Sequence, residues 1–156
     1  MPKIVGKNSE LRQKIIQELR RIIEESRGKL KPKLAIVYGS IARGDWHQGS
    51  DIDLLVISES AHPKFTERAK PLQIVVHGFP VEPRIYTMRE FEQMLSHGRM
   101  TALDALTEGI IIYAEKSYMK GIREKLKQTI EKLKPEKTCN GWKLHITSES
   151  DREFST

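Results

Sequence analysis

The segment GSIARGDWHQGSDIDLLVI, residues 39–57, joins two apolar runs through a turn-rich loop and places two aspartates at the start of the second run. The run before it, residues 33–38, is short and apolar, and it predicts a buried strand that ends at Gly39-Ser40. Residues 41–43 can begin a helix, and residues 51–57 predict a second strand. A strand, a Gly-Ser turn and a strand carrying carboxylates are therefore expected in direct succession.

The composition fits one compact domain of ordinary size. The chain has 156 residues, of which 38% are hydrophobic and 31% charged. Its net charge is +6 and its isoelectric point about 9.4, but the basic residues are scattered among acidic ones along helical stretches. A solvated surface is favoured over a dedicated nucleic-acid face, while some affinity for polyanions such as nucleotides stays open.

Cysteine usage and hydropathy indicate the compartment. Cys139 is the only cysteine in the chain, so no internal disulfide can form. The first ten residues lack the apolar core of a signal peptide, and the apolar runs fall far short of the roughly 20 residues of a membrane helix. We expect a cytoplasmic protein without a membrane span.

The remaining periodicity predicts a mixed arrangement of helices and strands. Residues 9–27 predict an amphipathic helix that Gly28 ends, residues 72–77 and 81–86 predict a hairpin that turns at 78–80, and Thr87 with Glu90 predicts a capping box that opens a helix ending at Gly98. A helix (100–107), a strand (109–113) and a helix (117–133) follow. This order predicts an α/β (α+β) fold: a single domain with a mixed β-sheet flanked by helices.

Asp51 and Asp53 are the candidate ligands of a metal ion. Residues two apart in a strand point to the same side, so two carboxylates would sit side by side at the edge of an apolar sheet. A divalent cation such as Mg²⁺ would relieve their repulsion, and Mg²⁺ commonly recruits the phosphates of a nucleoside triphosphate. An isolated Asp-x-Asp is more often a solvated turn, but the adjoining Gly39-Ser40 turn favours the metal site, since its backbone N–H groups would face a phosphate.

The two motifs resemble a known signature. Gly39-Ser40-Ile41-Ala42-Arg43-Gly44, followed by Ser50-Asp51-Ile52-Asp53-Leu54, resembles the DNA polymerase β-type nucleotidyltransferase superfamily, specifically its minimal, antitoxin-like branch. The resemblance implies a nucleotidyltransferase domain over residues 1–134 with its core at 33–115. Residues 135–156 fall outside it, and their composition indicates a weakly ordered tail with at most a short strand through Trp142 and Ile146.

The resemblance also implies a third carboxylate on a later strand, and the matching position is Glu82. Two features depart from the family pattern: the family usually has Asp there, and Pro83 removes a backbone donor, which suggests an edge strand or a bulge. The alternative is a surface glutamate paired with Arg84.

The implied reaction moves a nucleoside monophosphate from a triphosphate, with ATP favoured, to a hydroxyl acceptor. Asp51, Asp53 and Glu82 would bind two Mg²⁺ ions, with Glu82 as the general base. The nucleotide would be bound by residues of the two motifs: Gly39, Ser40, Arg43 and Ser50. Arg43 could equally pair with an acidic neighbour.

Members of this branch often act as antitoxins beside a separate HEPN-type toxin, so a protein acceptor of that kind is the first expectation. The rival is a catalytically weak nucleotide-binding or partner-binding module of the same fold. Extension of a nucleic-acid 3′ end ranks last, because no concentrated basic stripe supports it.

Overall fold

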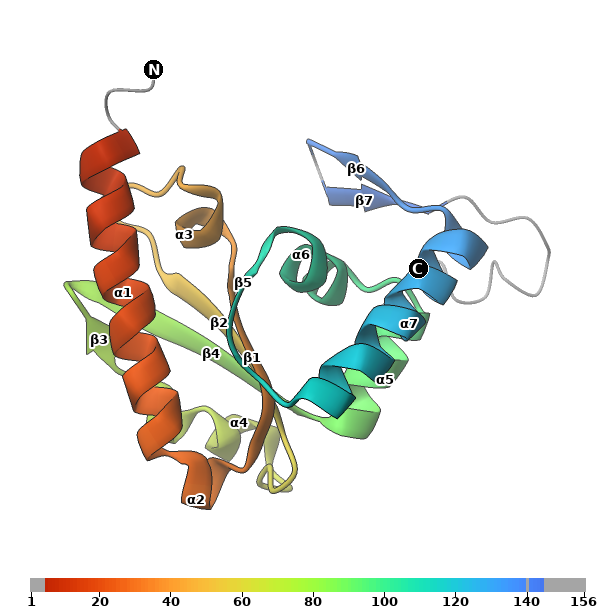
Figure 1. Cartoon of the computed structure of the whole chain (residues 1–156), viewed down its shortest axis with the longest axis horizontal. Helices are drawn as coiled ribbons and strands as arrows, with labels where there is room; N and C mark the ends of the chain where they lie inside the picture. Colours follow the sequence, from red (N-terminus) through yellow and green to blue (C-terminus); the bar gives the residue numbers. More distant parts are fainter. Residues whose placement is uncertain (1–4, 140, 145–156) are drawn as a thin grey trace.

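The computed structural model describes residues 5–139 and 141–144 (Figure 1). The two longest helices, α1 and α7, lie near the two ends of the described chain, and strands and shorter helices alternate between them. In chain order the elements are α1 (Val5–Glu25), α2 (Arg27–Leu30), β1 (Pro32–Tyr38), α3 (Ser40–Arg43), β2 (Ile52–Ser58), α4 (Phe65–Arg68), the 3₁₀ turn η2 (Lys70–Leu72), β3 (Val75–Val76), β4 (Phe79–Thr87), α5 (Met88–Ser96), α6 (Met100–Glu108), β5 (Ile110–Ala114), α7 (Lys116–Leu133), β6 (Glu136–Thr138) and β7 (Gly141–Lys143).

Five strands form a mixed sheet in the order β3-β4-β2-β1-β5. Strand β1 pairs antiparallel with both β2 and β5, and β3 pairs antiparallel with β4. Strands β2 and β4 are parallel, with Asp53 opposite Glu82. The predicted mixed sheet is confirmed.

Helices cover both faces of this sheet (Figure 1). Side chains alternate across a strand, so β1 and β2 contribute to two separate cores. On one face Ala35, Val37 and Leu54 pack with α1, and on the other Leu34, Ile36 and Leu55 pack with α5, α6 and α7. The α/β (α+β) class with flanking helices is therefore what the structure shows.

The first helix ends differently from expectation. The sequence predicts that Gly28 stops it, but α1 ends at Glu25 and Gly28 lies inside the short helix α2. The left-handed residue that ends α2 is Lys31, with φ 45°. The prediction is wrong because a glycine within a helix costs only about 1 kcal/mol relative to alanine, so it need not end one.

The hairpin between β3 and β4 also turns elsewhere. Val76 pairs with Phe79, which leaves His77 and Gly78 as a two-residue turn, and both have positive φ (49° and 85°). Such turns match the twist of the strands they join. Phe79 and Pro80, predicted to be in the turn, are the first residues of β4, and β3 is only two residues long.

The capping box that opens α5 is confirmed. The Glu90 backbone N–H donates to Thr87 Oγ1 (3.1 Å), and the Thr87 N–H donates to Glu90 Oε1 (2.8 Å). The same Glu90 oxygen accepts a hydrogen bond from Arg68 Nη1 of α4 (2.6 Å). Helix α4, which no sequence pattern predicted, is thereby tied to the start of α5.

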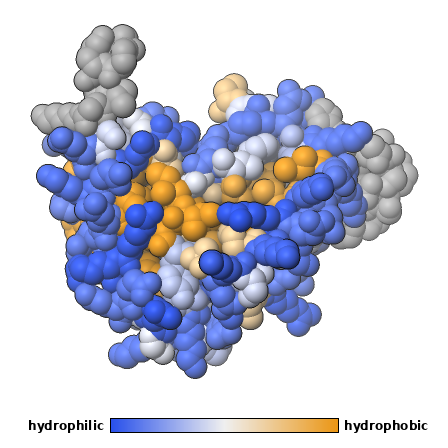
Figure 2. Space-filling view, in the orientation of Figure 1, coloured by the Kyte–Doolittle hydropathy of each residue, from blue (hydrophilic) through white to orange (hydrophobic). Residues whose placement is uncertain are grey.

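Strand β5 is an edge of the sheet. Apolar surface gathers between α1 and α7 on the face shown in Figure 2, over β5, whose Ile110, Ile111 and Tyr113 are partly exposed. The register between β1 and β5 shifts between Ala35 and Ile36. Irregularities of this kind disfavour the addition of another strand to an exposed edge.

Strands β6 and β7 pair antiparallel as a small hairpin, where a weakly ordered tail was expected. Asp104 of α6 anchors it: Lys137 Nζ lies 2.6 Å from Asp104 Oδ1, and Trp142 Nε1 donates to the same oxygen at 2.8 Å. Trp142 thus lies in a strand, as expected, while Ile146 lies outside the described residues.

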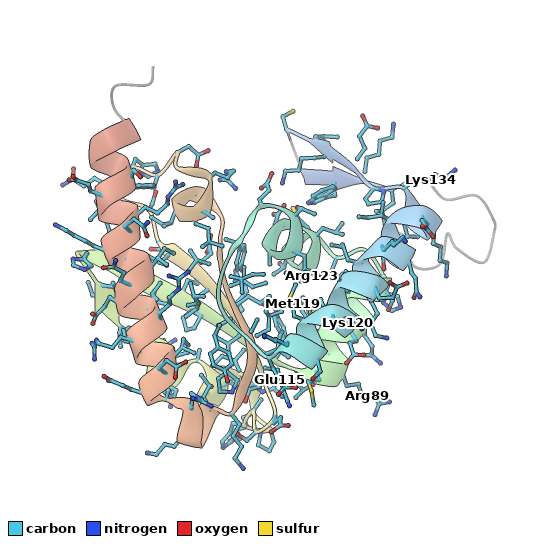
Figure 3. All side chains as sticks on the ribbon, in the orientation of Figure 1. Arg89, Glu115, Met119, Lys120, Arg123 and Lys134 are labelled. Atoms are coloured by element: carbon cyan, nitrogen blue, oxygen red, sulfur yellow. The ribbon has the colours of Figure 1, made fainter. Side chains whose placement is uncertain are left out.

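Several basic side chains lie on the side of the molecule opposite α1. Arg89 of α5 and Lys120, Arg123 and Lys134, in and just after α7, lie there (Figure 3). A groove of about 590 Å³ between α5 and α7 is lined in part by Arg89, Lys125 and Lys132. Among the described residues, no helix combines the length and apolar character needed to cross a membrane.

Candidate active site

Three neighbouring strands bring the predicted site residues to one end of the sheet. Gly39 directly follows β1, and Tyr38 at the end of β1 is the register partner of Asp53 in β2. Asp53 is in turn the register partner of Glu82 in β4. The Gly-Ser turn and two of the three predicted carboxylate residues therefore meet at the same end of the sheet, which we call the site edge.

Asp53 lies directly against Gly39. A Cβ atom at position 39 would be 2.2 Å from Asp53 Oδ2, so only a residue without a side chain leaves room for this carboxylate. Gly39 also has φ 74° and ψ −152°, a conformation that is essentially restricted to glycine. The glycine of the Gly-Ser motif thus shapes the site by admitting Asp53.

The surroundings of Asp53 raise the pKa of its carboxyl group. Burial raises the pKa of Asp53, and the neighbouring charges of Glu82 and Asp51 raise it further, while Arg84 and Arg43 oppose the shift. The surroundings of Asp53 therefore favour its neutral form. A cation beside it would reverse that preference.

Asp51 lies just outside β2. The sequence predicts a strand that includes it, but β2 begins at Ile52, and Asp51 is exposed. Its charge nevertheless acts on Asp53. The expected pair of aspartates is present as one half-buried and one exposed carboxylate.

Glu82 is half-exposed and faces Arg84, whose Nη2 lies 3.8 Å from Glu82 Oε1. Both interpretations of Glu82 thus find support, since it is the register neighbour of Asp53 and also has an ion-pair partner. Strand β3 pairs only with Phe79 and Pro80 of β4, so Pro83 is paired on one side alone, with Leu54 of β2. This locally open side of the strand suits a residue without a backbone donor, as the sequence suggested.

A divalent cation suits these donors chemically, because carboxylate oxygens are the ligands that Mg²⁺ prefers. Their present arrangement is open: within residues 5–139 and 141–144, no three carboxylate, imidazole or thiol groups are gathered closely enough to hold a metal ion. Glu82 is the member turned toward another partner. Asp53, Asp51 and a reoriented Glu82 would be the residues to hold the cation.

The other predicted nucleotide-binding residues surround this edge. Ser40 is the first residue of α3, and the Arg43 and Gly44 N–H groups bond back to the carbonyls of Gly39 and Ser40. Ser50 is buried, and its hydroxyl accepts a hydrogen bond from the His47 N–H (2.9 Å), which closes the loop.

Arg43 pairs with acidic neighbours, the second of its two predicted roles. Its Nε donates to Asp45 Oδ2 (3.2 Å), and its Nη1 lies 3.9 Å from Glu108 Oε1. The same Glu108 oxygen lies 3.8 Å from Lys137 of the C-terminal hairpin. One carboxylate therefore lies between the motif and the hairpin.

Two residues near the site escaped sequence reasoning. Arg12 of α1 donates from Nη1 to the carbonyl oxygen of Ala42 (3.0 Å) and so fixes α3. Tyr38, expected only in the core, is buried, but it also stands beside Asp53, and burial raises its pKa to about 12. Neither residue carries a local sequence signal, because both contacts depend on tertiary packing.

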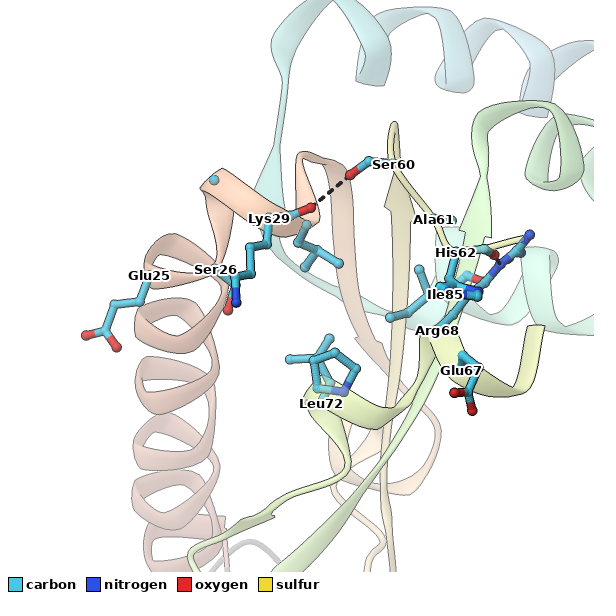
Figure 4. A pocket seen from close by; sticks show the side chains of 13 residues that line it. Glu25, Ser26, Lys29, Ser60, Ala61, His62, Glu67, Arg68, Leu72 and Ile85 are labelled. Carbon is cyan, nitrogen blue, oxygen red and sulfur yellow. Dashed lines mark hydrogen bonds between the residues drawn. The ribbon is translucent and has the colours of Figure 1, made fainter. Parts of the chain in front are cut away.

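A separate cavity of about 510 Å³ lies between α2, the segment after β2 and the α4–η2 region (Figure 4). Its rim includes Ser60, whose Oγ donates to the Lys29 carbonyl oxygen (2.8 Å). Arg68, Leu72 and Ile85 also line it. None of the predicted site residues lines this cavity, so it is distinct from the edge that carries Asp53.

Comparison with known proteins places this site in context. The family described as nucleotidyltransferase domain matches residues 16–134. The "Putative protein adenylyltransferase MJ1305" of Methanocaldococcus jannaschii is 29% identical over 129 residues, which cover 75% of this chain and 86% of that relative.

Two solved structures are similar in outline. One is described as "a putative nucleotidyltransferase from Sulfolobus solfataricus", with TM-score 0.49, 17% identity and coverage of 70% of this chain and 88% of that one. The other is a mutant of the toxin-antitoxin MntA-HpeT, with TM-score 0.49, 16% identity and coverage of 74% and 82%. The assignment rests on the family match, which spans most of the chain: this protein belongs to the nucleotidyltransferase domain family and is a nucleotidyltransferase.

Proposed function

We propose that this enzyme transfers AMP from ATP to a hydroxyl group on a partner protein, with Mg²⁺ bound by Asp51, Asp53 and Glu82. The observation that carries the proposal is the half-buried carboxylate of Asp53 beside the glycine of the Gly-Ser turn. The name of the 29% identical relative, a protein adenylyltransferase, supports AMP and a protein acceptor. The resemblance of the two motifs to the antitoxin-like branch makes a HEPN-type toxin the proposed partner.

Each residue has a role that its position supports. The turn at Gly39 and the hydroxyl of Ser40 would hold the triphosphate, assisted by the first turn of α3, whose N–H groups have no partners within the helix. Ser50 would keep the loop closed through His47. Arg43 would reach a phosphate only by leaving Asp45 and Glu108.

In the reaction, the acceptor oxygen forms a bond to the α-phosphorus while the bond from that phosphorus to the bridging oxygen breaks. Pyrophosphate leaves, and Glu82 takes the proton of the hydroxyl. Bound Mg²⁺ would supply charge neutralisation on the phosphates and acidify the acceptor hydroxyl.

The second candidate is a module that binds nucleotide or partner without efficient transfer. The Glu82–Arg84 ion pair favours it, because a glutamate committed to an arginine is not free to act as base or ligand. The two candidates share the fold and differ only in turnover.

The test supplies ATP labelled on the α-phosphate, with Mg²⁺, to the enzyme and candidate HEPN-type proteins. Label on the protein that is lost in Asp53→Asn and Glu82→Gln, but kept in the exposed control Glu131→Gln, supports transfer. Nucleotide binding without label transfer supports the module. Transfer of label from ATP labelled instead on the γ-phosphate, or label on added RNA instead of protein, would overturn the proposal.

A further inference from the structure

Arg84 occupies a distinctive place beside the predicted carboxylates. It lies in β4 two residues after Glu82, and its register partner in β2 is Leu55, two residues after Asp53. Because alternate residues share a face of the sheet, Arg84 lies on the same face as Glu82 and Asp53. Its side chain is 37% exposed.

The charge of Arg84 acts on three strands. It favours the ionised forms of Asp53 on β2, Tyr38 on β1 and Tyr86 on β4, in each case against the effect of burial. Arg43 is the other cation that acts on Asp53, from α3. Its Nε contact to Asp45 and its proximity to Glu108 direct Arg43 away from Glu82.

Glu82 is the carboxylate that Arg84 contacts directly, at 3.8 Å. Glu82 thus has a cationic partner two residues along its own strand, while its charge also acts on Asp53. The same guanidinium neutralises an edge that would otherwise hold three negative charges close together.

We propose that Arg84 is the resident counter-cation of this site and a positioning residue: it holds Glu82 until a divalent cation displaces it. The inference rests on the proposed function, which makes Glu82 a metal ligand. A guanidinium and a divalent cation then compete for one carboxylate. Removing the guanidinium should strengthen metal binding, whereas removing a merely structural arginine would weaken it or leave it unchanged.

The experiment measures Mn²⁺ binding by titration calorimetry and by the loss of the free-ion electron paramagnetic resonance signal, without nucleotide. Arg84→Gln is expected to bind Mn²⁺ about 2- to 5-fold more tightly than wild type, the range that corresponds to one partly exposed ion pair. Arg84→Met, which keeps an unbranched apolar stem, should show the same gain if the glutamine variant folds poorly. Arg84→Lys should stay near the wild-type affinity.

Two controls separate the causes. Arg89→Gln removes an equal charge from the exposed surface of α5, away from the site, and should not change the affinity. In a Glu82→Gln background, Arg84→Gln should give no gain over Glu82→Gln alone, because the two residues act through one contact.

The outcomes distinguish this inference from the proposed function. If wild type binds Mn²⁺ and both charge-removing variants bind it no more tightly, the role of Arg84 is refuted while the proposed metal site stands. If wild type binds no Mn²⁺, the metal-dependent function fails and this inference fails with it.

Discussion

The carboxylate of Asp53 fills the space that a side chain at Gly39 would need, since a methyl carbon at that position would lie only 2.2 Å from Asp53 Oδ2. The turn and the acid are thus one unit: the glycine at the end of β1 is required by a residue of β2. The placement of Asp53 therefore requires glycine at position 39, the position at which we propose that the triphosphate binds.

Gly39→Ala should therefore remove activity by displacing Asp53. The methyl group would force the carboxylate to rotate, and the backbone conformation at 39 would cost about 1–3 kcal/mol of folding free energy. We expect at least about a hundredfold loss of transfer, the scale of a misplaced catalytic group, together with a lower melting temperature. Label transfer and thermal denaturation would measure the two effects.

Gly121→Ala is the matched control for that substitution. A Cβ at Gly121, in the middle of α7, meets no atom within 4 Å. Alanine should stabilise the helix by about 0.5–1 kcal/mol and leave transfer unchanged. A loss of activity in Gly121→Ala would show that the site is sensitive to remote changes and would weaken the interpretation of Gly39→Ala.

Asp53→Asn should stabilise the metal-free protein at neutral pH. Since burial and neighbouring acids raise the pKa of Asp53, ionising it costs folding free energy at every pH above that pKa. The neutral amide avoids this cost, and we expect a gain of about 0.5–1 kcal/mol, typical of relieving a functional site. The gain should shrink as the pH falls and the wild-type carboxyl takes up its proton.

Mg²⁺ should reverse the order. A ligand that binds only the folded state stabilises it, so added Mg²⁺ should raise the melting temperature of wild type more than that of Asp53→Asn. Thermal denaturation with and without Mg²⁺ measures both. Equal responses of the two proteins to Mg²⁺ would contradict a cation at Asp53.

Glu90→Gln should weaken the link between α4 and α5 in a pH-dependent way. Burial would raise the pKa of Glu90, but the hydrogen bonds from Arg68 and Thr87 outweigh it and lower the pKa below its usual value. A lowered pKa contributes stability that is present above the ordinary glutamate range and is lost as the pH falls through the folded-state pKa.

Because the Glu90 side chain is 41% exposed, solvent screening limits the effect to about 1 kcal/mol at neutral pH. The difference in unfolding free energy between wild type and Glu90→Gln should therefore disappear in acid. A difference that stays constant with pH would instead indicate a purely steric role of this side chain.

Tyr38 should ionise late in an alkaline titration. Burial raises its pKa to about 12, above the ordinary value of 10.0, so the folded state keeps the proton longer than the unfolded state. The protein consequently loses stability as the pH rises through that interval. Absorbance of tyrosinate, compared between wild type and Tyr38→Phe, should show the missing transition near pH 12; a midpoint at the ordinary value would mean that Tyr38 is accessible to water.

Local patterns predicted the fold more completely than the site. The capping box of Thr87 and Glu90 and the strands on either side of the 39–51 segment are determined by neighbouring residues, and the structure has them as expected. The turn at His77–Gly78 lies one residue earlier than predicted because Pro80 resembles a turn residue but belongs to the start of β4, where it pairs with Val75 of β3. The surroundings of Arg84 depend on the parallel pairing of β2 with β4, which no local pattern specifies.

The register that places Asp53 beside Glu82 has a consequence for folding. Strands β1 and β2 are adjacent in sequence and antiparallel, so the turn and Asp53 can come together by closing a short loop. Glu82 arrives only through a crossover connection, which is slower to form and is stabilised late. We therefore expect partially folded chains to bring Asp53 to the turn at Gly39 before Glu82 is in place. The proposed site of three carboxylates would then be completed only in the last step of folding.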